Sequence, residues 1–164
     1  MQVLQIVYYV YTIMIIIAHR GLVQGPNSDL ENDPQHIQQL LNAGWHVEID
    51  VRHQLDGWYL GHDHAQYPVS VEFLLQPRLW IHVKDTSAST HMMQLQQSHH
   101  HLNFFWHESD SRTLTSQHYW WTQPGHDLVY RSVAVMPEWC TSDVTECVQW
   151  PCVAVCTDWG SKLS

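Results

Sequence analysis

A stretch of residues 45–63 limits the possible folds more than any other part of the chain. Residues 47–51 alternate with the two-residue period of a β-strand, so Glu48 and Asp50 share one face and apolar side chains the other. Two like charges on an otherwise apolar strand are costly to bury unless a cation neutralises them or one of them takes up a proton. The pattern therefore predicts a buried strand whose acidic face binds a hard metal ion.

The same stretch continues into a second strand. Asp56 and Gly57 form a pair typical of tight turns, and residues 58–61 then read as a short strand. His62 and Asp63 follow this strand directly. We expect the imidazole to supply an acid or a base beside the carboxylates, with a turn-capping role for His62 as the structural alternative.

The chain begins with a nearly continuous apolar run over residues 3–18. This run lacks a basic start and a small-residue cleavage site, and it is short for a membrane span. We therefore interpret residues 14–18 as a buried parallel strand and residues 1–13 as an extension outside the domain. His19 and Arg20 follow at the end of that strand.

A helix is predicted between the first strand and the acidic strand. Asp33 is a good N-cap, Pro34 suits the first helical position, and Gly44 ends the apolar stripe that follows. A strand, a helix and a strand in this order form a right-handed crossover, which makes the two strands parallel.

Composition supports one folded domain over residues 14–164. Hydrophobic residues make up 45% of the 164 residues, and nine are Trp, which excludes a disordered chain. The 16 acidic residues outnumber the 7 basic ones, and the net charge of -9 opposes binding to nucleic acid or to an anionic membrane surface. We expect no stable membrane insertion, and the oligomeric state stays open.

All four cysteines lie in the last quarter of the chain, and none is in a CxxC pair. A zinc site usually has more closely paired ligands. We therefore expect reduced, partly buried thiols in a cytoplasmic protein.

The remaining strand and helix patterns define the expected fold class. Strands are expected at residues 79–84, 102–107, 118–122, 132–136 and 152–157, and helices at 71–75 and 86–97. Polar residues gather where these strands end, as in a barrel with its site on the C-terminal face. The fold prediction is α/β, a shortened TIM-like (β/α) barrel with helices missing or reduced in its second half. Such barrels usually need about 200 residues or more, so an open α/β sheet is the alternative.

Four sequence blocks carry a resemblance to a known family. They are Ile17-Ala18-His19-Arg20-Gly21, Glu31-Asn32, Glu48-Ile49-Asp50-Val51 and Gly61-His62-Asp63. In order and spacing they resemble the glycerophosphodiester phosphodiesterases, relatives of the phosphatidylinositol-specific phospholipases C. Thr157-Asp158-Trp159 is similar to the end of the family's last strand, whereas residues 64–150 look more like a compact branch.

The resemblance implies roles for individual residues. His19 and His62 would be the acid and base pair, Arg20 would bind the substrate phosphate, and Lys84 would face the phosphoryl group. On the residues alone, Lys84 inside a barrel needs an anionic partner, which is either Asp50 or a phosphate.

The resemblance also implies a metal site. Glu48 and Asp50 would be ligands, and His82 stands where the family has a third carboxylate. An imidazole can hold the same ion, and Glu108 at the end of the next strand is the alternative ligand. The expected ion is Mg²⁺ or Ca²⁺, with Mn²⁺ as a further candidate. The structural alternative is that the two acids pair with Arg20 or Arg52.

The expected function is therefore that of a metal-dependent hydrolase in lipid metabolism. It would cleave a glycerophosphodiester or a related small phosphodiester by histidine acid–base catalysis. The alternative is a non-catalytic module that keeps the site and binds a phosphorylated glycan or headgroup. A lyase that stops at a cyclic product is a third possibility.

Overall fold

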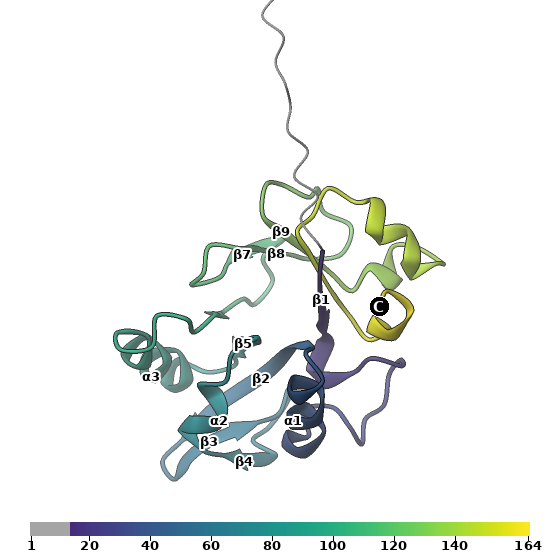
Figure 1. The fold of residues 1–164 in the computed structure, drawn as a ribbon. Helices are drawn as coiled ribbons and strands as arrows, with labels where there is room; N and C mark the ends of the chain where they lie inside the picture. The colour runs from purple at the N-terminus through teal and green to yellow at the C-terminus, as the bar shows by residue number, and fades with distance from the viewer. Residues whose placement is uncertain (1–13) are drawn as a thin grey trace, which may run out of the picture.

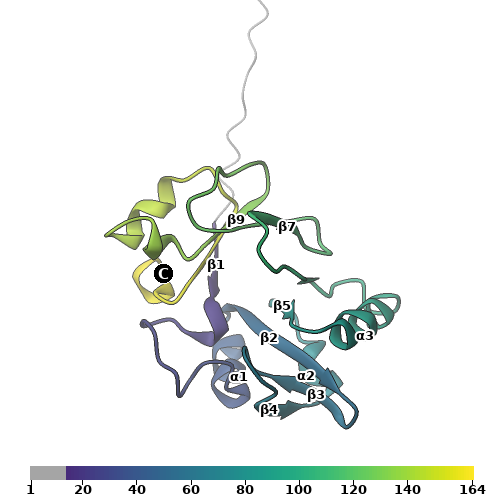
Figure 2. The ribbon, with the colours of Figure 1, turned by 180° about the vertical axis from the view of Figure 1, so that it is seen from behind.

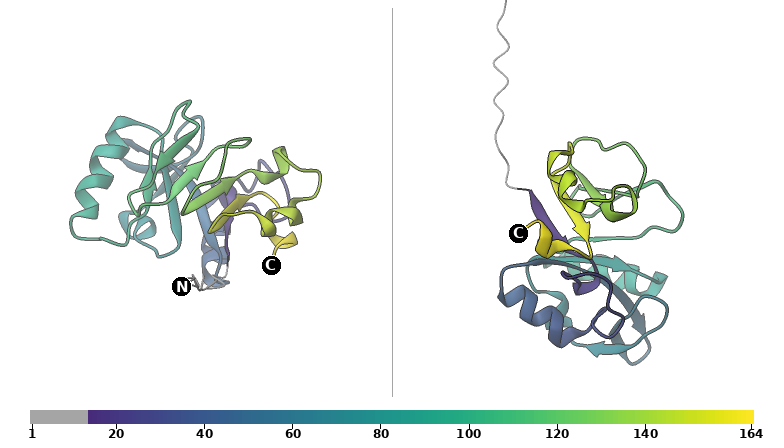
Figure 3. Two further views of the ribbon diagram at one scale, coloured as in Figure 1. Left: turned by 90° about the horizontal axis from the view of Figure 1, so that it is seen from above. Right: turned by 90° about the vertical axis from the view of Figure 1, so that its right-hand side faces the viewer.

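A single mixed β-sheet runs through residues 14–164, the part of the chain that the computed structural model describes (Figure 1). The predicted extension over residues 1–13 lies outside the described residues. The sheet contains ten strands and curls into a half-barrel. Its first and second halves lie on the two sides of the first strand (Figure 3).

The ten strands are β1 (Ile15–Ala18), β2 (His46–Gln54), β3 (Gly57–Leu60), β4 (Tyr67–Val69), β5 (Leu79–Val83), β6 (Phe104–Phe105), β7 (Arg112–Leu114), β8 (Trp120–Thr122), β9 (Ser132–Val135) and β10 (Ala154–Thr157). The α-helices are α1 (Pro34–Asn42), α2 (Val71–Leu74) and α3 (Thr86–Gln96), and the 3-10 turns are η1 (His19–Gly21), η2 (Pro137–Trp139), η3 (Val144–Gln149) and η4 (Gly160–Lys162).

Seven strands form a parallel run in the order β6, β5, β2, β1, β10, β9 and β8. The first residues of β2 pair with β1, while its last residues form an antiparallel hairpin with β3, which in turn pairs with β4. At the other end of the sheet, β7 is antiparallel to β8. Seen from behind, β3, β4 and α2 lie at the opposite end of the molecule from β7 and β9 (Figure 2). The predicted parallel arrangement of β1 and β2 is confirmed.

The prediction of a shortened TIM-like barrel is wrong. Within residues 14–164, no ladder joins β6 to β7 or β8, so the sheet does not close. Isolated contacts bridge this gap, such as the hydrogen bond from Ser116 N to Phe104 O at 2.8 Å. The physical reason is that β6 has two residues and the later connections carry only 3-10 turns, too little structure to continue the repeated strand–helix units of a barrel.

The predicted first helix is confirmed as α1. The Asp33 side chain accepts a hydrogen bond from His36 N at 2.6 Å, and Pro34 occupies the first helical turn. Ile37, Leu40 and Leu41 are buried, because the apolar stripe faces the sheet.

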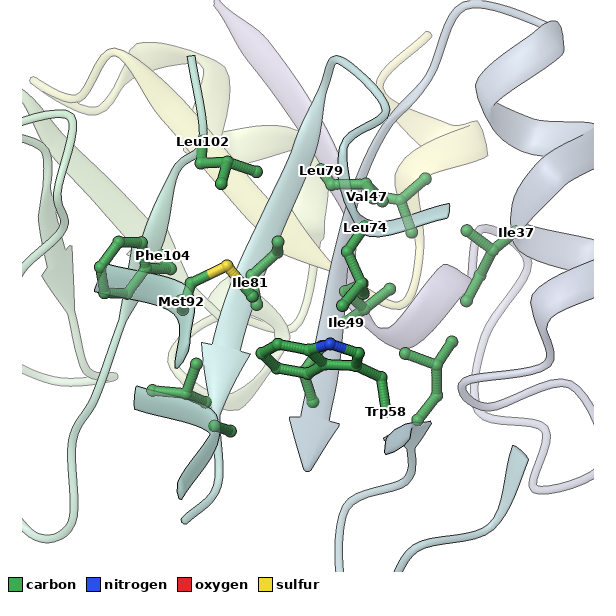
Figure 4. Close-up of a cluster of buried hydrophobic side chains, with 14 of the residues drawn as sticks. Ile37, Val47, Ile49, Trp58, Leu74, Leu79, Ile81, Met92, Leu102 and Phe104 are labelled. Carbon is green, nitrogen blue, oxygen red and sulfur yellow. The ribbon is translucent and has the colours of Figure 1, made fainter. Parts of the chain in front are cut away.

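Apolar clusters cover both faces of the sheet. On the outer face, α1, α2 and α3 pack side chains such as Ile37, Leu74 and Met92 against Ile49 of β2 and Ile81 of β5 (Figure 4). The inner, concave face carries a second cluster, composed of Ile17, Trp80, Phe105, Trp121, Val133, Val135, Met136, Ala154 and Cys156. Because side chains alternate along a strand, Glu48, Asp50 and His82 lie on the concave face as well.

The described residues contain no helix long and apolar enough to cross a membrane. The four cysteines are free thiols, of which Cys140 is exposed and Cys147 and Cys156 are buried. Burial raises the pKa of the Cys147 thiol to about 12.

Candidate active site

A pocket of about 750 Å³ opens at the C-terminal ends of the parallel strands. The side chains that line it include all seven of the predicted site residues, His19, Arg20, Glu48, Asp50, His62, His82 and Lys84. They come from β2, from β5 and from the segments that follow β1, β3 and β5. The structure therefore brings these residues together, although they are spread over residues 19–84.

Glu48, Asp50 and His82 form a compact cluster at this pocket. One ligand atom from each lies within 4.8 Å of the others. All three are buried, with exposed fractions of 2%, 1% and 7%, so bulk water cannot screen the two charges. The register of the parallel pair β2–β5 sets Asp50 directly opposite His82.

Asp50 has several polar partners. Asn32 holds it with two hydrogen bonds, from Asn32 Nδ2 to Asp50 Oδ2 at 3.0 Å and from Asp50 N to Asn32 Oδ1 at 2.9 Å. Arg20 Nε and His82 Nδ1 each lie 3.2 Å from a carboxylate oxygen of Asp50, and Lys84 Nζ lies 3.6 Å away. Burial alone would raise the pKa of Asp50, but the His82 hydrogen bond and the nearby cations hold it well below its usual range.

The pKa of Glu48 is shifted in the opposite direction from that of Asp50. Its Oε2 accepts a hydrogen bond from Arg20 N at 3.0 Å. Burial and the charge of Asp50 raise the pKa of Glu48 above its usual value, against the opposing effects of His19, His82 and Arg20. The cluster thus retains a carboxylate whose negative charge is poorly compensated.

These residues fit a divalent cation. A second positive charge beside Glu48 and Asp50 would remove the cost of burying both carboxylates. His82 Nε2 is buried without a hydrogen-bond partner among residues 14–164, so the imidazole has a free nitrogen. Two carboxylates favour hard ions such as Mg²⁺, Ca²⁺ or Mn²⁺, and the imidazole extends the range toward softer metals.

His19 is held by a carboxylate from the other end of the chain. Its Nδ1 lies 2.8 Å from Asp158 Oδ1, so the carboxylate accepts the Nδ1 proton and leaves Nε2 available to a substrate. Burial lowers the pKa of His19, but the Asp158 hydrogen bond and the charge of Glu48 outweigh it, and the pKa is raised overall.

His62 lies on the loop after β3 and is more exposed than His19. Its Nδ1 lies 2.7 Å from Asp63 Oδ1. The Arg52 side chain donates hydrogen bonds to the carbonyl oxygens of Gly61 and His62, which fixes the start of this loop. The two imidazoles reach the pocket from different strands, each with a neighbouring carboxylate on Nδ1.

Arg20 and Lys84 already have anionic partners. Arg20 adopts a left-handed backbone conformation, with φ of 51°, and its Nη1 donates to Glu31 Oε2 at 2.9 Å. Both cations also lie near Asp50. The structure therefore contains the ion pairs of Arg20 and Lys84 with Asp50 that the sequence offered as the structural alternative. Since both side chains line the pocket, a bound phosphate would share them with these carboxylates.

The structure also identifies partners that the sequence did not assign. Asp158 is 139 positions from His19, and only its place in the terminal Thr157-Asp158 block pointed to the site. His107 stacks on His82 with ring centroids 4.4 Å apart, and burial together with His82 lowers the pKa of His107 to about 4.

Glu108, the alternative ligand, lines the pocket but is exposed and lies outside the three-residue cluster.

Three tryptophans also line the pocket. Trp106, Trp121 and Trp139 line it together with Gln123 and Met136. Trp121 is 3% exposed and stacks on Phe105, whereas Trp139 is 72% exposed.

Comparisons of the chain with protein-family models, with curated proteins and with solved structures find no match. The resemblance to the glycerophosphodiester phosphodiesterases therefore stays a prediction from the four sequence blocks. The chemical role of the pocket must follow from its own geometry.

Proposed function

We propose that the chain is a metal-dependent phosphodiesterase that hydrolyses a glycerophosphodiester or a related small phosphodiester. The observation that carries this proposal is the set of groups in one pocket: a metal-ligating cluster, two imidazoles and two cations. Cleavage of a phosphodiester needs charge neutralisation on the phosphoryl oxygens, a base for the attacking oxygen and an acid for the leaving oxygen. The pocket contains a candidate for each of these roles.

The charged groups would bind the phosphate. A divalent ion held by Glu48, Asp50 and His82 would act as a Lewis acid toward a phosphoryl oxygen. Arg20 and Lys84 would donate charge-assisted hydrogen bonds to the other phosphoryl oxygens. The net charge of -9 disfavours polyanionic substrates such as nucleic acids, so a small diester with one phosphate fits best.

The two imidazoles would move the protons. One takes the proton of the attacking hydroxyl while the other protonates the oxygen that leaves, so the net proton count is unchanged. Asp158 keeps the Nδ1 proton on His19, which leaves Nε2 as the reactive nitrogen. Asp63 Oδ1 lies 2.7 Å from Nδ1 of His62, in a more exposed contact, and would favour the same tautomer.

A cytoplasmic location is part of this proposal. The four cysteine thiols are free, as is usual in a reducing compartment.

A non-catalytic binding module is the second candidate. The contacts of Arg20 with Glu31 and of Lys84 with Asp50 favour it, because an enzyme benefits from cations that are free to meet the transition state. The replacement of a third carboxylate by His82 favours it as well. Such a module would bind a phosphorylated glycan or headgroup without turnover.

Turnover separates the two candidates. The full chain is assayed with glycerophosphocholine and with a chromogenic phosphodiester, with added Mg²⁺, Ca²⁺ or Mn²⁺ and after treatment with EDTA. We expect metal-dependent hydrolysis that is lost in His19→Ala and retained in His100→Ala, an exposed histidine outside the pocket. Phosphorus NMR of the product distinguishes hydrolysis from a lyase that stops at a cyclic phosphate. Binding without turnover, or equal activity in the two variants, would contradict the proposal.

A further inference from the structure

We infer that Glu138 is a positioning residue for His19 and that it acts through Asp158. This inference rests on the proposed function, because it concerns the histidine that would transfer protons there. Glu138 belongs to η2, which is separated from β9 by Met136 alone, and Asp158 directly follows β10. The carboxylate of Glu138 therefore joins the ends of two neighbouring strands.

Both oxygens of Glu138 are engaged at the end of β10. Glu138 Oε1 accepts hydrogen bonds from Thr157 Oγ1 and from Asp158 N, both at 2.9 Å. Glu138 Oε2 also lies 2.9 Å from Thr157 Oγ1, so the single hydroxyl proton is shared between the two carboxylate oxygens. Hydrogen bonds to an ionised acceptor are about twice as strong as neutral ones, so this carboxylate holds the strand end firmly.

Asp158 is in turn fixed at three atoms. Its amide donates to Glu138, its carbonyl oxygen accepts from Gly25 N at 2.7 Å, and its Oδ1 lies 2.8 Å from His19 Nδ1. Gly25 is closely packed there, because a Cβ at this position would lie 2.6 Å from the Trp159 ring. The direction of the Asp158 side chain, and with it the orientation of the imidazole, follows from these contacts.

The place of Glu138 separates it from residues that touch a substrate. Met136, Trp139 and Asp158 line the pocket, and Glu138 does not. Glu138 also makes no salt bridge within residues 14–164, so its charge is used only in hydrogen bonds to the end of β10. The Glu138 carboxylate therefore fixes the position of Asp158, the partner of His19, without lining the pocket itself.

A double-mutant cycle tests this relation in the full chain. Glu138→Gln keeps the size of the side chain and removes its charge, and Asp158→Asn removes the acceptor that orders His19. We expect each variant to lower kcat by about tenfold to a hundredfold, with little change in KM or in Mn²⁺ affinity. If Glu138 acts through Asp158, the double variant loses no more activity than Asp158→Asn alone.

Glu146→Gln is the matched control, because Glu146 is exposed and its side chain, among the residues that the structure describes, bonds only to Thr141 in the neighbouring turn. It should keep wild-type kcat. Multiplicative losses in the double variant, or equal rates for Glu138→Gln and the control, would overturn the inference. If Glu138→Gln does not fold, Thr157→Val removes the hydroxyl donor instead, and a smaller loss of kcat in the same direction is expected.

A second readout needs no activity. The Nδ1 proton of His19 in a hydrogen bond to a carboxylate gives a low-field proton NMR signal, which His19→Ala identifies by its loss. We expect this signal to be lost or shifted in Asp158→Asn and Glu138→Gln and kept in Glu146→Gln. Wild-type protein that hydrolyses no phosphodiester would refute the proposed function, whereas an unchanged signal in Glu138→Gln would refute the inference.

Discussion

Asp50 is the residue on which most polar contacts of the pocket converge. Asn32 makes two of them and is 1% exposed, in a left-handed backbone conformation with φ of 57° that asparagine tolerates better than most residues. The Asn32 side chain therefore orients the Asp50 carboxylate.

Replacement of Asn32 should be costly. Asn32→Ala leaves the amide of Asp50 without its partner and removes one of the contacts of Asp50 Oδ2, which keeps Arg20 Nε at 3.2 Å. We therefore predict a loss of about 1–3 kcal/mol in the free energy of unfolding. Urea denaturation measures this loss. Asn27→Ala, which removes an exposed turn contact with Asp29, should change stability far less, and equal effects of the two substitutions would contradict the assigned role.

Glu48 should make the stability of the metal-free protein depend on pH. Its pKa in the folded state is raised by burial and by Asp50, so the folded state favours the protonated form. The stability associated with this group is complete below its ordinary pKa and is lost as the pH rises through the raised value. In EDTA, we predict that Glu48→Gln flattens this fall in thermal stability.

The same substitution should abolish stabilisation by metal. A ligand at 100 times its Kd stabilises the folded state by about 2.7 kcal/mol, which thermal unfolding with added Mn²⁺ would detect in the wild type. A Glu48→Gln variant that keeps both the pH dependence and the Mn²⁺ shift would show that Glu48 is not a ligand.

Sequence reasoning located the pocket residues that lie at strand ends. Glu48 and Asp50 follow from alternation along one strand, and His19 and Lys84 from their place at the ends of others. Asp158 and Glu138 were not assigned as partners of the site, because long-range hydrogen bonds leave no periodic signal in the sequence. His82 at the cluster agrees with its expected position, while its role as a ligand stays a prediction.

At the scale of elements, the turn after β3 depends on Gly61. Gly61 and Gly57 both have positive φ, of 142° and 135°. A Cβ at Gly61 would lie 2.2 Å from His64 O, whereas a Cβ at Gly57 would meet nothing of residues 14–164 within 4 Å. The carbonyl oxygen of Gly61 also accepts from Arg52. The close approach of the backbone therefore sets where His62 enters the pocket.

This difference predicts unequal effects of two alanine substitutions. Gly57→Ala should cost only the backbone strain, about 1–3 kcal/mol. Gly61→Ala adds a clash with backbone, so we predict a larger loss of stability together with a loss of kcat. Calorimetry and the phosphodiesterase assay measure both effects. Equal losses in the two variants would show that the His62 loop tolerates displacement.

Most regular elements of the first half were predictable, and two short strands were not. The strands β1, β2 and β5 and the helix α1 have clear periodicity and end signals. By contrast, β4 and β7 have three residues each, and β4 contains Pro68, which usually argues against a strand. Their antiparallel pairing is a tertiary effect that short segments do not encode by themselves.

For the whole molecule, the prediction of a barrel was wrong because polar residues at the ends of strands do not show whether the sheet closes on itself. An open half-barrel and a closed barrel put the same C-terminal ends on one side, so both explain the gathering of polar residues in one pocket. What differs is the second half, where β6, β7 and β8 have two or three residues each. The existence of one domain over residues 14–164 stays a prediction.

The missing strand pairing between β6 and the β7–β8 hairpin, here called the open seam, predicts uneven protection of the amides against hydrogen exchange. The pairing of β2 with β5 runs over five residue pairs, and their outer face is buried under α1, α2 and α3. The contacts between β6 and the β7–β8 hairpin are isolated hydrogen bonds. We predict that amides of β2 and β5 exchange most slowly and those of β7 much faster. Uniform slow exchange across both halves would contradict an open seam.

The central claim is that Glu48, Asp50 and His82 together hold a divalent ion in the pocket that contains His19 and His62. Anomalous diffraction from crystals grown with Mn²⁺ tests it most directly. The account predicts one strong peak within about 2.0–2.6 Å of a ligand atom from each of the three side chains. A peak elsewhere in the protein, or a fully ordered cluster without a peak at saturating Mn²⁺, would contradict it.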